Sequence, residues 1–150
     1  MLKNNRGVTL TALIIMVLVL LIIVGTTVIC STDILRNSDK SKLKSNLYLV
    51  KARAETLLED YLFDGTDNLG TEATDSQIEA VGFDEYTGNY IYRVWDATKL
   101  TEEGIDVDSV KDSEVFIVQY DLTNDSVDVA STIGYEDEDG NEIYILSELD

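Results

Sequence analysis

The 150-residue chain contains no histidine and no proline, and it has a single cysteine. The absence of histidine removes the side chain that most often acts as a general base or binds a metal ion. One cysteine cannot form a disulfide within the chain or complete a cysteine-rich zinc site. Because the sequence also lacks a nucleophile–base pair and a glycine-rich phosphate loop, we predict that the protein is not an enzyme.

Basic residues are also scarce, with 11 Lys and Arg against 29 Asp and Glu, and the formal net charge is −18. A phosphate backbone would repel such a chain, so we predict no nucleic-acid partner. The charge is uneven, because residues 1–53 hold eight of the basic residues and only two acids. This asymmetry indicates two environments, one near a membrane and one in open solvent.

A long apolar run is present at residues 8–32, where no side chain is charged. As a helix these 25 residues would extend about 37 Å, against about 30 Å for the hydrocarbon core of a bilayer. Lys3 and Arg6 precede the run and would keep the N-terminus in the cytoplasm. The pattern therefore predicts a transmembrane helix over residues 8–32, with the remainder outside the cell.

The helical pattern continues over residues 33–63, where apolar residues recur at alternating steps of four and three. Leu58 and Leu62 widen this stripe, and no Pro or Gly interrupts the chain between Gly25 and Gly65. We expect one helix over residues 8–63 whose second half is amphipathic. The stripe consists of Leu43, Leu47, Val50, Ala54, Leu57 and Tyr61.

Residues 64–150 read as a globular domain that contains a short helix and several strands. A helix is expected over 74–80, and strands are expected over 90–95, 115–120, around 127–129, and over 143–146. The predicted fold class is α+β: a long N-terminal helix, apolar and transmembrane in its first half and amphipathic in its second, packed on a small, mostly antiparallel sheet. We interpret the strand aromatics as core residues rather than a ligand face: Tyr90, Tyr92, Trp95 and Tyr120.

The N-terminal residues, with this architecture, resemble the type IV pilin and pseudopilin family. Lys3 and Arg6 form a short basic leader ending at Gly7, and Val8, Thr9 and Leu10 then open the apolar helix. The segments YRVWDATKLTEEGID and VFIVQYDLTNDSVDVA also resemble pilin-like proteins of clostridia and related Gram-positive bacteria. The resemblance implies a leader over residues 1–7, cleavage after Gly7 by a prepilin peptidase, and methylation of the new N-terminal amine of Val8.

The same resemblance implies that Thr9, Leu10 and Ala12 belong to an assembly motif. Most major subunits of the family carry glutamate at the position of Ala12, where its carboxylate pairs with an N-terminal amine during assembly. Its absence is typical of some minor subunits and of many Gram-positive pilin-like proteins. A charge in an apolar filament core is costly unless it is paired, so the substitution bears on which kind of subunit this is.

The leading hypothesis is a structural, pilin-like subunit of a type IV pilus or type II secretion-like filament. Its expected partners are other pilin or pseudopilin subunits, the prepilin peptidase and the membrane. It would be a single-pass cell-membrane protein before assembly and part of a surface filament afterwards. One alternative is an uncleaved single-pass protein with an extracytoplasmic binding domain, and another is a protein secreted after conventional cleavage near Gly25, Thr26 and Thr27.

One further candidate site is the acidic segment at residues 136–142. Oxygen ligands around a glycine turn suit Ca²⁺, and some pseudopilins hold calcium in a comparable loop. The alternative is a solvated hairpin turn with its bend at Asp139–Gly140 or Gly140–Asn141. No other cofactor is expected, and the calcium ligands would be Asp137, Asp139, Asn141 and Glu142.

Overall fold

The computed structural model describes residues 10–83, 89–106 and 113–149, apart from the side chains of residues 21–36. The chain divides into two compact units, residues 1–38 and residues 39–150. The predicted leader over residues 1–7, and with it Gly7, Val8 and Thr9, lies outside the described residues.

Helix α1 (Leu10–Asp64) contributes to both units. In the ranges that the structure describes, no helix carries an apolar stretch long enough to cross a membrane. The predicted fold class is therefore wrong in its transmembrane first half. The apolar side chains described there run from Leu10 to Leu20, and eleven helical residues cover only about 16 Å, roughly half of a bilayer core.

In the second unit, α1 packs its apolar stripe against a sheet, as its periodicity predicts. All six stripe residues take part in one core cluster, with Tyr61 partly buried and the other five buried. Leu58 joins that cluster, but Leu62 is 47% exposed and belongs to neither core cluster, so its place in the stripe was wrong. The hydrophobic effect of burying this stripe holds the second half of α1 against the sheet of its unit.

The sheet is a five-stranded antiparallel meander in the order β1-β2-β3-β4-β5. Strands β2 and β3 match the predicted strands to within one residue, whereas the two-residue β1 was not predicted. Strand β4 extends well beyond its predicted centre at Val127 and Val129. The strands are β1 (Thr71–Glu72), β2 (Tyr90–Trp95), β3 (Phe116–Asp121), β4 (Ser126–Glu136) and β5 (Glu142–Ile145).

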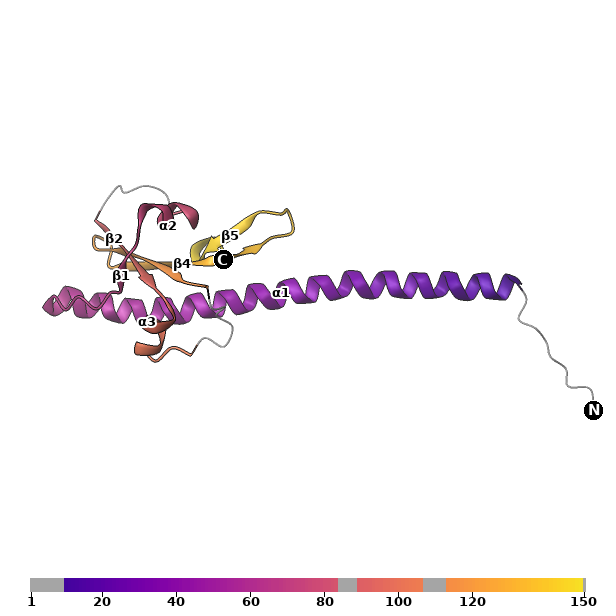
Figure 1. The fold of residues 1–150 in the computed structure, drawn as a ribbon, viewed down its shortest axis with the longest axis horizontal. Coiled ribbons are helices and arrows are strands. Elements are labelled where there is room, and N and C mark those ends of the chain that lie inside the picture. Colours follow the sequence, from indigo (N-terminus) through magenta and orange to yellow (C-terminus); the bar gives the residue numbers. More distant parts are fainter. Residues whose placement is uncertain (1–9, 84–88, 107–112, 150) are drawn as a thin grey trace, which may run out of the picture. The chain divides into compact units, whose positions relative to one another are not determined.

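The two faces of the sheet bury different elements, so this unit has three layers (Figure 1). One face packs on α1 through Trp95, Phe116 and Tyr120. The other packs on Ile78 and Val81, which belong to helix α2 (Asp75–Ala80) and its C-cap. Successive side chains of a strand point to opposite faces of the sheet. Because both faces of this sheet are covered, apolar residues occur at successive positions of its strands.

Short helices and turns complete the unit. Helix α3 (Ala97–Glu102) starts where the Asp96 carboxylate accepts the backbone N–H of Lys99 at 2.9 Å, which is an N-cap. A 3₁₀ turn (Leu146–Glu148) closes the chain. Gly70 has a φ of +117°, and a Cβ there would lie 2.9 Å from the Trp95 ring, so this close approach requires glycine.

Candidate functional site

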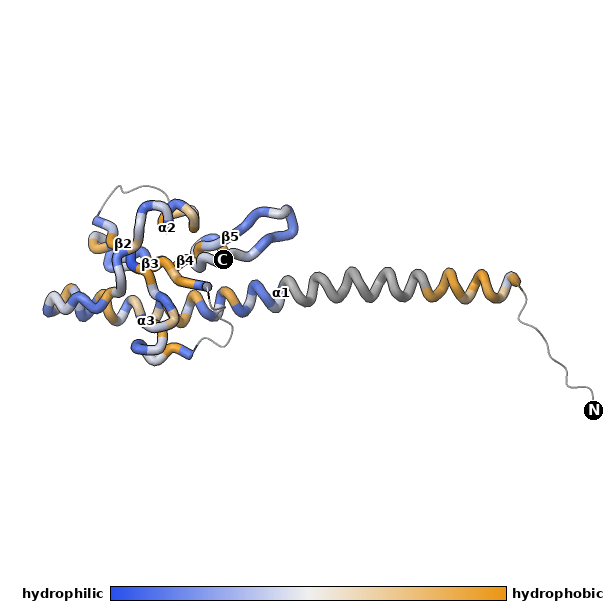
Figure 2. Tube along the Cα trace, in the orientation of Figure 1, coloured by the Kyte–Doolittle hydropathy of each residue, from blue (hydrophilic) through white to orange (hydrophobic). Residues whose placement is uncertain are grey.

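The first candidate site is the apolar start of α1. Leu10 is the first described residue of the helix and Ala12 lies in its first turn, while Gly7, Val8 and Thr9 of the predicted processing and assembly motif are not among the described residues. Each large apolar side chain between Leu10 and Leu20 is 48–74% exposed. Figure 2 shows this segment as a largely hydrophobic stretch. Such a surface is far more apolar than water tolerates without a partner.

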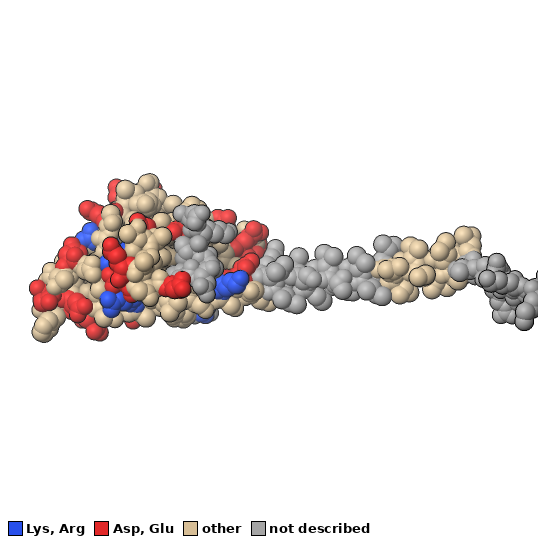
Figure 3. All heavy atoms as spheres, turned by 60° about the horizontal axis from the view of Figure 1, so that its bottom comes forward, with Lys and Arg blue, Asp and Glu red and all other residues tan. Residues whose placement is uncertain are grey.

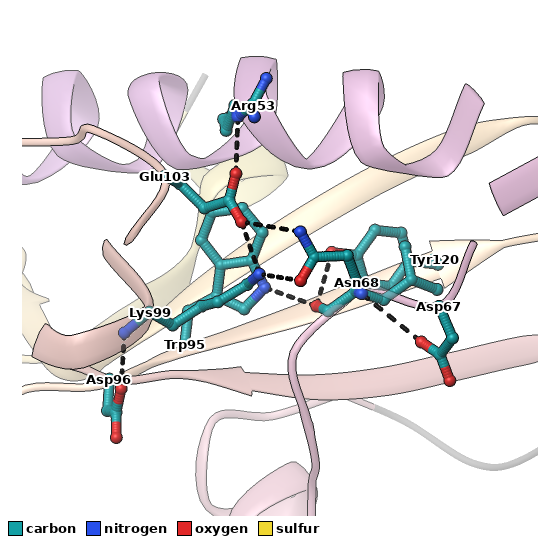
Figure 4. A network of polar contacts seen from close by, with 9 residues as sticks. Arg53, Asp67, Asn68, Trp95, Asp96, Lys99, Glu103 and Tyr120 are labelled. Carbon is teal, nitrogen blue, oxygen red and sulfur yellow. Dashed lines mark hydrogen bonds and ion pairs between the residues drawn. The ribbon is translucent and has the colours of Figure 1, made fainter. Parts of the chain in front are cut away.

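The second candidate is a cluster of paired charges where α1, α3 and the loop before β1 meet (Figure 4). The Glu103 carboxylate accepts Arg53 Nε at 2.8 Å and Lys99 Nζ at 2.5 Å. Asn68 joins through both ends of its amide, accepting Lys99 Nζ at 2.9 Å and donating to Glu103 at 3.3 Å. We call these four residues the Glu103 network.

Aromatic side chains lie directly beneath the Glu103 network. Trp95 Nε1 and the Tyr120 hydroxyl both donate to the carbonyl oxygen of Leu69, at 2.7 and 3.0 Å. Lys99 Nζ lies 5.7 Å from the Trp95 ring centroid, within cation–π range. Burial raises the pKa of Tyr120 far above its ordinary value, so its hydroxyl stays a neutral donor.

The electrostatics of this cluster indicate a structural role. Burial acts to raise the pKa of Glu103, but the hydrogen bonds from Lys99 and Arg53 outweigh it and lower that pKa below 4.5. The carboxylate is thus held ionised between two cations. A hollow of about 330 Å³ lies alongside and is lined largely by polar residues, including Asp67 and Asp96. The hydrogen bonds and ion pairs of the Glu103 network therefore hold α1 against α3 and against the loop before β1.

Sequence reasoning did not identify the Glu103 network. The only local signal was the spacing of Lys99 and Glu103, which are four residues apart near α3. Arg53 lies fifty residues before Glu103, and Asn68 lies in a loop, so no local pattern connects them.

The acidic segment forms the turn between β4 and β5. The Asp137 carboxylate accepts the backbone N–H of Asp139 at 2.9 Å and that of Asn141 at 2.8 Å, and it also accepts the Asn141 side-chain amide at 3.1 Å. Gly140 takes a φ of +83° at the bend. Hydrogen bonds from Asn141 lower the pKa of Asp137. These contacts are those of a hairpin turn closed by its own carboxylate.

The four proposed calcium ligands lie close together in sequence, but several already have partners. Asp137 is engaged within the turn, and Glu142 accepts the hydroxyl of Tyr144. Among the residues that the structure describes, no group of three or more acidic, histidine or cysteine side chains is placed to hold a metal ion. Calcium binding by Asp137, Asp139, Asn141 and Glu142 therefore stays a prediction.

The interpretation of the strand aromatics as core residues is confirmed. Trp95, Tyr120 and Tyr92 are buried, and Tyr90 packs partly buried against the second core cluster. Tyr90 and Tyr92 also line a hollow of about 280 Å³, together with charged residues that include Glu72, Asp75 and Arg93.

Comparisons with known proteins identify no relative: no family model, no curated protein and no solved structure matches this chain. The resemblance to pilins thus rests on the sequence motif and stays a prediction.

Proposed function

We propose that this chain is a structural, pilin-like subunit of a type IV pilus or type II secretion-like filament. It is processed after Gly7 and assembles through its N-terminal helix with other subunits of the same kind. Ala12 stands where most major subunits of the family carry glutamate, so the proposal covers both a minor subunit and a Gram-positive pilin-like protein. The prepilin peptidase is the proposed processing partner. That the chain resides in the cell membrane before assembly, and in a surface filament afterwards, stays a prediction.

The observation that carries the proposal is the exposed apolar surface between Leu10 and Leu20. Each large apolar side chain gains about 1.5–3 kcal/mol when it is fully removed from water. Nine such side chains within eleven residues of one helix therefore supply a strong driving force for association. Helices of sister subunits present the same chemistry on every side and can cover one another.

The acidic surface of the second unit also supports the proposal. Figure 3 shows acidic side chains spread over the face of this unit that the view presents, with few basic ones among them. A strongly charged exterior keeps an assembly soluble and limits sideways aggregation. The Glu103 network and the core hold this unit together independently of the apolar residues 10–20.

Processing is tested by the intact mass and N-terminal residue of the protein purified from its native cells. We expect loss of residues 1–7 and one added methyl group on Val8. Protein that keeps Met1 while the peptidase is active contradicts the proposed processing.

Assembly is tested with Val17→Arg, which places a charge on the exposed apolar surface. A charge buried between apolar helices without a partner costs several kcal/mol, so we expect assembled material to fall at least tenfold. Thr123→Arg, in an exposed turn of the second unit, is the matched control and should assemble normally. Equal assembly of the two variants contradicts the proposal.

A further inference from the structure

A lysine, an asparagine amide and a glutamate meet at the centre of the Glu103 network. Lys99 Nζ lies 2.9 Å from Asn68 Oδ1 and 2.5 Å from Glu103 Oε1. The Asn68 Nδ2 group donates to the same Glu103 oxygen at 3.3 Å. Each of these three side chains therefore contacts the other two (Figure 4). One carboxylate oxygen thus touches both the amine nitrogen and the amide nitrogen.

Two of the three groups are held away from water. Lys99 is 8% exposed, and the Glu103 side chain is 4% exposed. The Trp95 ring, which is fully buried, lies 5.7 Å from Lys99 Nζ. Buried ions are costly, and transfer of a proton from an ammonium to a carboxylate turns two ions into two neutral groups. The amine that results from such a transfer is a nucleophile.

Asn68 supplies an electrophilic carbon within reach of that amine. Its Cγ atom is bonded directly to Oδ1, so a small rotation of the amide brings Cγ toward Lys99 Nζ. Well-oriented groups held this close react as if at an effective concentration of roughly 10⁵–10⁸ M. Asn68 lies in the exposed loop before β1, and a polar hollow of about 330 Å³ adjoins it. A small leaving molecule can therefore escape to solvent.

We propose that Lys99 and Asn68 become joined by an isopeptide bond within the chain, with Glu103 as the catalytic residue. Glu103 accepts a proton from the Lys99 ammonium, and the neutral amine attacks Asn68 Cγ. Glu103 then carries protons from Nζ to Nδ2, the Nζ–Cγ bond forms, the Cγ–Nδ2 bond breaks, and ammonium leaves. Nζ loses two protons and both depart on the ammonium nitrogen. Because Glu103 ends as a carboxylate again, the step needs no oxidant, reductant or cofactor.

Arg53 slows this reaction. Its Nε atom donates to Glu103 at 2.8 Å and so favours the ionised carboxylate, which opposes the first proton transfer. A slow step suffices, because the reaction occurs only once in each chain and the released ammonium is diluted into solvent. Until it occurs, the chain is held by the ion pairs of the Glu103 network, and freshly synthesised protein is in this unlinked form.

The bond would close a covalent loop in the second unit. Asn68 and Lys99 are 31 positions apart, and the segment between them contains β1, α2 and β2. By the chain-entropy argument for disulfides, such a cross-link stabilises a protein by restricting its unfolded chain. The inference goes beyond the proposed function and does not depend on it, because both linked residues belong to the second unit.

The intact mass tests whether the bond forms. The full-length chain is purified in detergent and kept at neutral pH, and the fluorescence of the buried Trp95 is used to verify that it is folded. We expect a mass about 17 Da below the sequence mass, because one ammonia is lost overall. The fraction of chains with this lower mass should rise with time after synthesis.

Digestion with trypsin identifies the linked residues. The unlinked chain releases residues 54–93, 94–99 and 100–111 as separate peptides. In the linked chain trypsin cannot cleave after Lys99, so residues 94–111 stay together and are attached to residues 54–93 through Asn68. Tandem mass spectrometry of this branched peptide locates the bond.

Three variants test the assigned roles. Lys99→Arg and Asn68→Ala should abolish the loss of ammonia. Glu103→Gln should reduce the linked fraction at a fixed time at least tenfold, because a positioned proton-transfer group contributes roughly 10²–10⁴-fold. Glu102→Gln, which changes the exposed acid next to Glu103, is the matched control and should link at the wild-type rate. The wild-type mass decides the question even if a variant fails to fold.

Three outcomes overturn this inference. Folded wild-type protein that keeps its full mass and is cleaved after Lys99 has an ion pair there and nothing more. Loss of ammonia from Lys99→Arg or Asn68→Ala places the reaction elsewhere in the chain, and linking of Glu103→Gln at the wild-type rate removes the catalytic role. The proposed filament depends on residues 10–20 and is tested by Val17→Arg, so its failure is distinguishable from the failure of this bond.

Discussion

Replacing Glu103 by glutamine should destabilise the second unit by about 2–3 kcal/mol. The carboxylate is the shared partner of Lys99 and Arg53, and Lys99 is only 8% exposed. After the change, Lys99 keeps Asn68 and the Trp95 ring but loses its counter-ion. The effect should stay below the 3–5 kcal/mol of a fully buried pair, because the Arg53 side chain is 41% exposed and can turn to water.

The assay can use the fluorescence of Trp95, which is the only tryptophan and is fully buried beside the network. With a urea m-value of about 1–2 kcal/mol/M for a unit of this size, the midpoint should fall by roughly 1–3 M. Glu102→Gln is the matched control. It changes the exposed last residue of α3, next to Glu103, and should shift the free energy of unfolding by less than about 0.5 kcal/mol.

The pH dependence gives an independent check. The pKa of Glu103 is lower in the folded state than its ordinary 4.5, so its contribution is fully present above pH 4.5 and is lost as pH falls through the folded value. Wild-type protein should therefore lose more stability between about pH 6 and about pH 3 than Glu103→Gln does. A variant with the wild-type midpoint, or with a parallel pH profile, would refute the reasoning.

Four other substitutions test the packing and the turns. Gly70→Ala should cost more than about 2 kcal/mol, because its Cβ meets the Trp95 ring, whereas Gly65→Ala, also at positive φ but with open space around it, should cost about 1 kcal/mol; urea unfolding compares them. Leu47→Ala should cost about 2–5 kcal/mol in the same assay, since that side chain is fully buried, and a cost under 1 kcal/mol would place it outside the core. Asp137→Ala should speed hydrogen exchange in the β4–β5 turn, measured by NMR without calcium, because the turn loses its acceptor; unchanged rates would contradict that role.

Much of the fold follows from local patterns in the sequence. The four-and-three spacing from Leu43 to Tyr61 identifies the helix face that meets the sheet, because side chains at those steps share one side of a helix. Runs such as YIYRVW and FIVQYD are rich in residues that suit a pleated, buried surface, and they form β2 and β3. The wrong part of the predicted fold class was the transmembrane first half of the helix, because no helix in the described residues is apolar over the length that a bilayer requires.

The candidate sites were only partly predictable. The exposed apolar start of α1 is visible as an uncharged run in the sequence, and so is the Lys99–Glu103 spacing. Which residues complete the Glu103 network is not visible, because Arg53 and Asn68 reach it only after the chain folds back. The sequence shows that residues 136–142 are acidic. It does not show that the Asp137 carboxylate accepts the backbone N–H of Asn141 and so closes the turn, because that contact depends on backbone geometry.

The sequence by itself determined where the chain is helical, which side of α1 is apolar and how its charge is divided, because these properties depend on neighbours a few residues apart. Only the tertiary structure decided that Leu58 is buried while Leu62 is exposed, and that Trp95 requires glycine at position 70. Those outcomes depend on how far the sheet and its loops extend over α1 and on which distant atoms they bring together, and neither is set by local preference.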